Sequence, residues 1–325
     1  MANKRLIAIG EALIDFIPDK NGCEFYEVTG FSPKLGGAPA NVCGAFARLG
    51  GTARLVTQLG NDPFGDKIMR ELADCDIDTS CISQTDKVNT ALAFVSLAED
   101  GNRTFSFYRK PSADMLLSPE QIKEEWFENV FALHFCSVSL GDFPMKQAHY
   151  RAIEAARKNG GMISFDPNLR FQLWDDPDEL KKTVLEFIPF SDILKISDEE
   201  LEFVTGENDF KKGIPKLFKG NVKMIVYTCG SETAYAFTQN NASASAAHKV
   251  SVKDTTGAGD GFIGSFLWKL QELGITAQTL ESIDEREQRA CLDFANAFCA
   301  ESVQKYGAIP SYPTLETIRQ QYSSL

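Results

Sequence analysis

Short apolar runs alternate with stretches of helical periodicity along almost all of this 325-residue chain. The apolar runs predict buried strands at residues 6–10, 54–60, 131–137, 162–166, 192–197 and 222–228. Between them, the spacing of apolar residues predicts helices that include 40–49, 64–73 and 146–159. Such alternation is typical of a doubly wound α/β fold, in which a mostly parallel sheet carries helices on both faces.

Two segments interrupt this alternation. Residues of about 12–34 lack a helical period and are broken by prolines and glycines. In the second segment, about 88–112, two alternating runs at 90–98 and 103–108 flank the turn-like residues 99–102. We expect the two segments to form a small β-sheet, either as a lid over a site or as a decoration of the main sheet's edge. The chain, 1–325, is then a single α/β domain with this sheet inserted.

The glycine-rich stretch 254–261 is the most informative segment for function. It leads into a run whose apolar residues share one face of a helix: Phe262, Phe266, Leu270 and Leu273. We therefore expect a helix that begins near Ala258. The free N–H groups and the dipole of a helix start attract anions. An acid at that place, Asp260, either caps a flexible turn or accepts a proton from a hydroxyl group that attacks a phosphate.

Composition and charge exclude several classes of protein. Asp and Glu number 45 against 33 Lys and Arg, a formal charge of −12, and no basic cluster suggests a nucleic-acid partner. No apolar run approaches the roughly 20 residues that a membrane span needs, and the N-terminus has no secretory pattern. The eight cysteines include no C-x-x-C pair, so we expect reduced thiols in a cytoplasmic protein. The three histidines lack the spacing of a zinc site.

Two common nucleotide-binding fingerprints are missing. No G-x-G-x-x-G follows the first strand, which argues against a nicotinamide-dependent oxidoreductase. No G-x-x-x-x-G-K-[ST] is present either, because Asp66 stands where the lysine of such a loop belongs. A nucleotide, if this protein binds one, is bound in another way.

Polar motifs follow several of the predicted strands. Gly36 and Gly37 lead into the helix that carries Asn41, where the backbone can approach a ligand closely and the amide can donate and accept. Ser197 and Glu200 make a capping box, which is also a sufficient structural reason for both. The other polar groups after strands are Asp15, Asp166, Asn168, Arg170, Thr228 and Gly230. Since the carboxyl ends of parallel strands lie at one edge of a sheet, we expect these groups to form a single site.

Together these residues resemble the ribokinase-like, PfkB-type carbohydrate kinases over almost the whole chain. Residues 36–41 are similar to the family's first signature and 254–267 to its second. Segments 107–117, 164–170 and 195–206 resemble those of fructokinases within the family. The resemblance implies the α/β fold with a β-lid and transfer of the γ-phosphoryl group of ATP to a sugar hydroxymethyl group, most closely that of D-fructose, giving fructose 6-phosphate.

The resemblance also implies roles for individual residues. Asp260 would be the catalytic base, and Gly257, Ala258 and Gly259 the anion hole. The implied sugar-binding residues are Asp15, Gly36, Gly37, Asn41, Phe107, Arg109, Asp166 and Arg170. The implied nucleotide-binding residues are Asn168, Lys195, Ser197, Thr228, Gly230 and Asn296; for Arg170 and Ser197 the choice between phosphates and nucleotide stays open. Glu200 would hold Mg²⁺ through water, and a monovalent cation such as K⁺ is implied near Asp254, Thr256 and Ser311.

Physical requirements support a metal and leave several substrates open. Several carboxylates near a polyphosphate would repel it without a cation, so the hypothesis requires Mg²⁺. Alternative substrates are aminoimidazole riboside, ribose and 2-keto-3-deoxygluconate; the pair Tyr108 and Arg109 resembles the one that binds the carboxylate of the last. Outside the class, a catalytically silent sugar or nucleotide sensor is the alternative. A lid with an apolar face could also join two copies of the chain.

Overall fold

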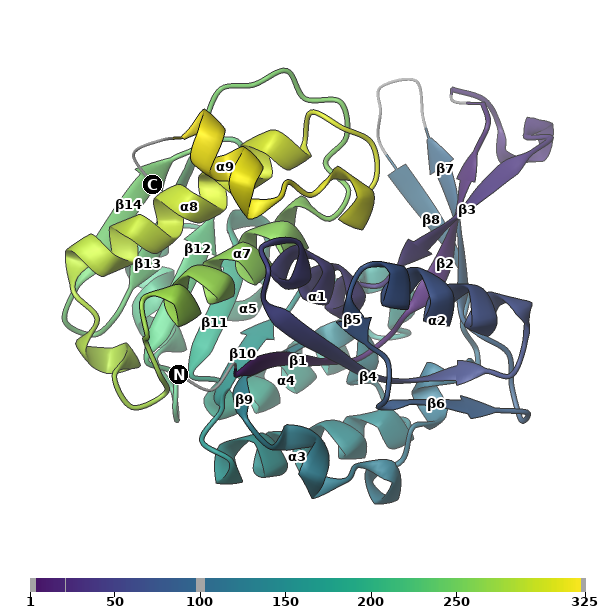
Figure 1. Cartoon of the computed structure of the whole chain (residues 1–325), viewed down its shortest axis with the longest axis horizontal. Helices are drawn as coiled ribbons and strands as arrows, with labels where there is room; N and C mark the ends of the chain where they lie inside the picture. The colour runs from purple at the N-terminus through teal and green to yellow at the C-terminus, as the bar shows by residue number, and fades with distance from the viewer. Residues whose placement is uncertain (1–3, 21, 98–102, 323–325) are drawn as a thin grey trace.

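A large, mostly parallel sheet forms the centre of the computed structural model, which describes residues 4–20, 22–97 and 103–322 (Figure 1). Its strands run in the order β14-β13-β12-β11-β10-β9-β1-β4-β5, and β6 also pairs with β4. The eight strands that pair in parallel are β1 (Arg5–Ile9), β4 (Thr52–Gly60), β5 (Ile77–Asp78), β6 (Ile82–Thr85), β9 (Val130–Cys136), β10 (Met162–Asp166), β11 (Ile193–Ser197) and β12 (Met224–Thr228). The antiparallel strands β13 (Thr233–Phe237) and β14 (Ala242–Ala246) complete one edge.

Helices cover both faces of this sheet, and each layer has its own hydrophobic core (Figure 1). One layer comprises α1 (Ala38–Arg48), α2 (Pro63–Asp74), α7 (Ala258–Glu272), α8 (Glu285–Ser302) and α9 (Leu315–Gln321). The other comprises α3 (Pro144–Lys158), α4 (Pro177–Phe187), α5 (Asp198–Thr205) and α6 (Phe210–Gly213). The strands between the layers are buried on both sides, which is why they read as nearly continuous apolar runs.

The predicted fold class is confirmed, and each predicted strand and helix coincides with an observed one to within about two residues. The helix expected near Ala258 begins at that residue. The expectation that Leu273 belongs to its buried face is wrong, because α7 ends at Glu272 and Leu273, in the C-cap, is 37% exposed.

A second sheet of four strands stands off one end of the main domain (Figure 1). Its order is β3-β2-β7-β8, from β2 (Leu13–Pro18), β3 (Phe31–Gly36), β7 (Leu92–Leu97) and β8 (Arg103–Tyr108). We call it the lid. The turn expected at 99–102 lies outside the described residues. Among the described residues, no helix is long and apolar enough to cross a membrane.

Candidate active site

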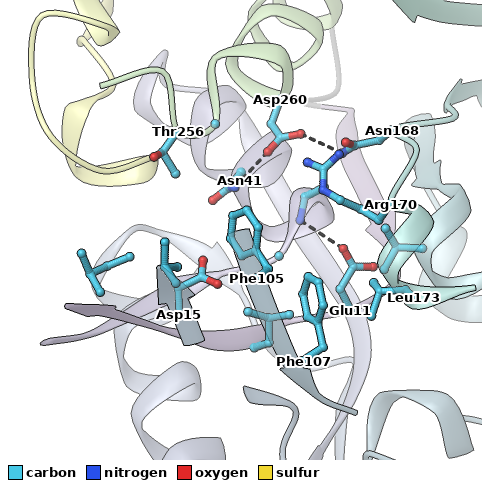
Figure 2. Close-up of a pocket in the computed structure, with 17 residues that line it drawn as sticks. Glu11, Asp15, Asn41, Phe105, Phe107, Asn168, Arg170, Leu173, Thr256 and Asp260 are labelled. Atoms are coloured by element: carbon cyan, nitrogen blue, oxygen red, sulfur yellow. Dashed lines mark hydrogen bonds between the residues drawn. The ribbon is translucent and has the colours of Figure 1, made fainter. Parts of the chain in front are cut away.

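A cavity of about 120 Å³ lies between the lid and the first turns of α1 and α7 (Figure 2). The lid contributes Leu13, Asp15, Ile17, Val95, Phe105 and Phe107 to its wall. The main domain contributes Glu11, Gly37, Ala38, Asn41, Val138, Asn168, Arg170, Leu173, Thr256, Gly257 and Asp260. We call this space the sugar cavity, after the ligand that the sequence implies.

The alternation of the lid strands decides which side chains reach the sugar cavity. Leu13, Asp15 and Ile17 point to one face of β2, so Phe16 lies on the other face, where its ring stacks on that of Phe94 at 4.7 Å between centroids. The lid therefore has an inner face toward the cavity and an outer aromatic face.

Asp260 lies in the first turn of α7 and is 9% exposed. Asn41 Nδ2 donates to its Oδ2 at 2.9 Å, and Asn168 Nδ2 lies 3.4 Å from its Oδ1, so that two amides converge on one carboxylate (Figure 2). Burial raises the pKa of the Asp260 carboxyl, while the Asn41 hydrogen bond opposes that rise. A carboxylate that is buried, oriented and made more basic than usual is suited to accept a proton.

The backbone before Asp260 requires glycine. Gly257, the N-cap of α7, has a φ of 70°, in the left-handed region. A Cβ there would lie 2.6 Å from the Cβ of Ala308, and the Tyr312 hydroxyl donates to the Gly257 carbonyl at 2.7 Å. This turn places the first N–H groups of α7 at the end of the helix, where a helix start attracts anions.

The glycine pair before α1 brings the backbone against the sugar cavity. Gly37, with a φ of 111°, leaves no room for a side chain because a Cβ would lie 2.5 Å from the Glu11 carbonyl oxygen. A Cβ at Gly36 would lie 2.2 Å from Asp15 Oδ2. One turn into α1, Asn41 Oδ1 is buried and has no hydrogen-bond partner within the described part of the chain. That oxygen is available to a ligand hydroxyl group.

A second cavity, of about 500 Å³, lies on the other side of the α7 start. Its wall includes Thr228, Gly230 and Asn296, together with Ala258 and Gly259. The Asn296 amide nitrogen is already bonded to the Ser245 carbonyl and hydroxyl oxygens, at 3.0 and 2.8 Å. The first turn of α7 thus belongs to both cavities, with Gly257 and Asp260 toward the sugar cavity and Ala258 and Gly259 toward the second.

A buried ion pair lies beneath this helix start. Lys195 Nζ is 3.0 Å from Asp166 Oδ2, with side-chain exposures of 8% and 1%. Burial raises the pKa of Asp166, and the Lys195 charge opposes that rise. Although burial acts against it, the pKa of Lys195 is raised by Asp166 and Glu200, so the ammonium stays charged. A Cβ added at Gly259 would lie 3.7 Å from Lys195 Nζ, which places that charge beside the anion hole implied by the sequence.

The capping box at the start of α5 is confirmed. Ser197 Oγ accepts from the Glu200 N–H at 3.2 Å, and Glu200 Oε2 accepts from the Ser197 N–H at 2.9 Å. Glu200 Oε1 accepts in addition from the Leu169 N–H at 3.0 Å. The box is the structural reason for both residues, and the Glu200 oxygens keep lone pairs for a further ligand.

The three residues implied for a monovalent cation come from neighbouring turns. Asp254 Oδ1 accepts from the Thr256 N–H at 2.8 Å and from its hydroxyl at 2.6 Å, and Asp254 Oδ2 accepts from the Gly307 N–H at 2.8 Å. Ser311 Oγ is bonded to the Ser302 hydroxyl at 2.7 Å. Among the residues that the structure describes, no group of three or more His, Cys, Asp or Glu could hold a metal ion by itself.

Arg109 does not line the sugar cavity. Its guanidinium donates through Nε and Nη2 to a single oxygen of Asp114, Oδ2, at 2.9 and 2.5 Å, and to the Val138 carbonyl at 3.1 Å. The side chain is 4% exposed. Arg109, like Gly36 and Asp166, is therefore not among the implied sugar-binding residues that line the cavity.

Sequence reasoning missed Glu11 and Phe105 as cavity residues. Glu11 follows β1 and is 3% exposed, and an acid directly after a buried strand is the same signal that pointed to Asp166. Phe105 stands two residues before Phe107 on one strand, so alternation places both rings on the inner face of the lid (Figure 2).

Comparisons of sequence and of structure with known proteins find relatives of the same kind. A model of the pfkB family of carbohydrate kinases matches residues 3–315. A probable fructokinase-2 of Arabidopsis thaliana is 40% identical over 314 residues, covering 96% of this chain and 94% of the relative. A fructokinase from Xylella fastidiosa with bound ATP has a TM-score of 0.89 at 32% identity, covering 99% of this chain and 100% of its own. A Vibrio cholerae O395 fructokinase double mutant with bound fructose, ADP and potassium ion has a TM-score of 0.86 at 32% identity, covering 98% of each chain.

Proposed function

This chain belongs to the pfkB family of carbohydrate kinases and is a sugar phosphotransferase, and on that basis we propose that it phosphorylates D-fructose with ATP, giving fructose 6-phosphate. The observation that carries the proposal is the position of the α7 start between two cavities, with the Asp260 carboxylate toward one and the Ala258 and Gly259 backbone toward the other. Two substrates in these cavities would meet at a base and an anion site.

Asp260 is the base of the proposed reaction. It accepts the proton of the C6 hydroxyl group as that oxygen attacks the γ-phosphorus, and the bond to the β-phosphate oxygen breaks. Asn41 and Asn168 hold the carboxylate in place from two sides. Most of the rate enhancement in such a reaction comes from alignment and electrostatics, which a buried, preorganised site provides.

The phosphates occupy the second cavity in this proposal, beside Thr228, Gly230 and Asn296. The Gly259 N–H, in the first turn of α7, stabilises the charge on the transferred group, whereas the Ala258 N–H donates to the Thr255 carbonyl at 3.1 Å. Lys195 adds a buried positive charge next to Gly259. Arg170, whose charge acts on Asp260, lies on the cavity wall within reach of the transferred group.

Glu200 is the residue proposed to hold Mg²⁺ through a bound water. Each of its two oxygens accepts a hydrogen bond from one backbone N–H group, and the residue is 7% exposed. The carboxylate oxygens therefore keep lone pairs for a water ligand. Mg²⁺ keeps several waters and prefers carboxylates and phosphates, so this donor set fits it. When bound, the ion neutralises phosphate charge.

The sugar is proposed to bind through hydroxyl contacts to Asp15 and Asn41, with the Gly37 backbone close by and the Phe107 ring against the sugar. Glu11, Asp15 and Asp260 give the cavity wall three acidic groups against one basic group, Arg170, and Arg109 is paired with Asp114 away from it. This balance favours a neutral sugar over 2-keto-3-deoxygluconate, whose carboxylate the three acids would repel. We therefore leave Arg109 out of the proposed sugar site.

A monovalent cation beside Asp254 and Thr256 is also part of the proposal. The two residues lie in the segment that leads into α7, and the 307–311 turn, with Ser311, packs against them. A potassium ion is present in the related fructokinase described above. A K⁺ at this place would stabilise the helix start, so activity is expected to rise when K⁺ replaces a large organic cation in the assay.

The outer face of the lid supports the proposal of a homodimer. On it Phe16 stacks on Phe94, and Phe31 and Tyr108 meet the Phe94 ring edge-on; Tyr108 is 65% exposed. Sedimentation of the purified protein, with Tyr108→Ser as the variant, tests this. All eight cysteines are free, which fits the proposed cytoplasmic location.

The test is ADP release with ATP and Mg²⁺ against fructose, ribose, aminoimidazole riboside and 2-keto-3-deoxygluconate. We expect fructose-dependent turnover that falls about 10²–10⁴-fold in Asp260→Asn, which keeps the shape and removes the base. Asp66→Asn, at an exposed acid in the first turn of α2, is the matched control and should turn over normally. Turnover with another sugar alone would reject fructose, and full activity of Asp260→Asn would reject the assigned base.

A further inference from the structure

Glu11 is a buried acid that takes no part in the proposed phosphoryl transfer step. It follows β1, is 3% exposed and lines the sugar cavity. Burial raises the pKa of its carboxyl, and the charge of Arg109 opposes that rise. Burying a carboxylate costs free energy unless other groups compensate, so the partners of Glu11 indicate what it does.

One oxygen of Glu11 holds the start of α1. Its Oε1 accepts from the Ala38 N–H at 3.2 Å. The N-cap of α1 is Gly37, which has no side chain, so Glu11 satisfies a free N–H group that an N-cap side chain would otherwise satisfy. One turn further along α1, Asn41 donates to Asp260. Glu11 therefore fixes the helix that holds the proposed base.

The other oxygen of Glu11 leads to the lid. Its Oε2 accepts from the Ser139 hydroxyl at 2.8 Å, and Ser139 Oγ accepts from Arg109 at 3.3 Å. Arg109 follows β8 directly and is held by Asp114. β8 also carries Phe105 and Phe107, whose rings line the sugar cavity.

We propose that Glu11 is a positioning residue that connects the lid to the catalytic base: its carboxylate joins the root of β8, through Ser139 and Arg109, to the first turn of α1. The two elements that this connection joins, β8 and α1, contribute Phe107 and Asn41 to the wall of the sugar cavity, so a lid seated on a sugar also sets Asn41 and Asp260. The connection limits transfer of the phosphoryl group to water until the lid is seated on a sugar. The kinetic consequence of this inference rests on the proposed function, whereas its structural consequence does not.

Ser139→Ala is the sharpest variant, because it removes the bridging hydroxyl and leaves Glu11, Arg109 and the lid rings unchanged. Ser137→Ala is the matched control: Ser137 lies in the same short turn, and its buried hydroxyl has no hydrogen-bond partner among the residues that the structure describes. Glu11→Gln is the second variant, since an amide has an acceptor oxygen at only one of the two positions that the carboxylate oxygens occupy.

The kinetic expectation separates positioning from general stability. For Ser139→Ala and Glu11→Gln, we expect KM for the sugar to rise roughly 5- to 10-fold, about the net contribution of one typical intramolecular hydrogen bond. KM for ATP should stay within about twofold, and the ratio of sugar-dependent to sugar-independent ADP release should fall. The sugar used is whichever of the panel the unmodified enzyme phosphorylates, so rejection of fructose leaves this test intact.

Hydrogen exchange gives a readout that needs no substrate. Amides of β8 and of the first turn of α1 should exchange faster in Ser139→Ala than in Ser137→Ala, both measured without ligands. Equal exchange and equal sugar KM in the two serine variants would overturn the proposal. So would faster exchange in β8 alone with α1 unchanged, because the two ends would then be independent.

Discussion

Asp260 owes its environment to residues from three separate parts of the chain. Asn41 comes from α1, Asn168 from the segment after β10, and the glycines before Asp260 from the start of α7. Two amide donors on one carboxylate favour its ionised form, while burial favours the neutral form. The balance between them sets the pH range in which Asp260 can act as a base.

Removal of the Asn41 amide should therefore change the pH profile. The pKa of Asp260 is raised by burial and lowered by the Asn41 hydrogen bond, so Asn41→Ala should raise it further. Since the base must be ionised, the acid limb of kcat/KM should move to higher pH in the variant. The measurement is kcat/KM for the sugar between pH 5 and 9.

A uniform fall in kcat/KM at every pH would contradict this effect on the base and would assign Asn41 to sugar binding alone. Asn159→Ala is the control for the loss of an asparagine. Asn159 is the C-cap residue of α3, and its side-chain amide donates to the Ala155 carbonyl.

For individual residues, the sequence motifs were more informative about Asp260 and the glycines of the helix starts than about the residues around them. Asp260, Gly257 and Asn41 could be selected because each lies in a glycine-rich helix start, whose backbone chemistry is visible in sequence. Arg109 could not be placed, because the acid that pairs with it, Asp114, determines its direction. Glu11 was missed because its partners, Ala38 and Ser139, are 27 and 128 residues away.

Among elements, the contact of α1 with α7 matters most for the site, because these helices carry Asn41 and Asp260. Gly264 of α7 lies against α1 so closely that a Cβ there would be 2.7 Å from the Cβ of Ala45 and 2.9 Å from the Val42 carbonyl oxygen. Because Gly264 has no side chain, the axes of α1 and α7 can approach each other closely at this residue.

Gly264→Ala should push α1 and α7 apart. We expect a loss of about 1–3 kcal/mol in the free energy of unfolding, because an added methyl group in a packed contact forces a backbone shift. Turnover should fall as well, since Asn41 and Asp260 lie on the separated helices. Urea unfolding and sugar kinase assays on the same preparation measure both effects.

The compensating change Ala45→Gly provides the control. The double variant Gly264→Ala with Ala45→Gly should recover part of the lost stability, because one of the two close contacts disappears while that with the Val42 carbonyl remains. No recovery would mean that the Ala45 contact does not limit the approach.

Element positions were predictable to the extent that they depend on local pattern. The buried strands and α7 could be located because the periodicity of apolar residues is local information. Leu273 continues that periodicity into the C-cap, and apolar spacing alone does not register the helix end that Gly274, with a φ of 74°, marks directly after it. The pairing of β2 with β7, which unites the two halves of the lid sheet, joins residues about 78 apart in the sequence and has no local signature.

Across the whole molecule, two buried histidines couple folding to pH. His134 contacts the Ser164 hydroxyl at 3.0 Å, and His149 contacts the Met145 carbonyl at 2.7 Å. Burial lowers the pKa of His134 to about 3 and that of His149 to about 4. In the unfolded chain an imidazole titrates near pH 6.5, about 2.5–3.5 units higher.

Acidification below about pH 6.5 should therefore remove the contribution of these neutral histidines to stability. Below that pH the unfolded chain's imidazoles bind protons that those of the folded chain do not, so the histidine contribution is complete above about pH 6.5 and falls progressively toward pH 4. Each histidine should contribute a loss of about 2 kcal/mol between pH 8 and pH 5. Urea unfolding at the two pH values measures the total.

His149→Gln should reduce this pH dependence by about half of the histidine contribution. His248→Gln, at an exposed position, controls for the loss of one imidazole. A pH dependence unchanged by His149→Gln would show that His149 does not remain neutral in the folded state.

The placement of the α7 start in the walls of both cavities has a thermodynamic consequence. Any adjustment of this single turn that improves the fit of one ligand alters the other ligand's binding free energy, so the two affinities are linked. Reciprocity then requires that the factor by which the sugar changes nucleotide affinity equals the factor by which the nucleotide changes sugar affinity. Two titrations, each with the partner ligand present or absent, should return the same number, and that number expresses the cooperativity that one shared helix end imposes on the enzyme.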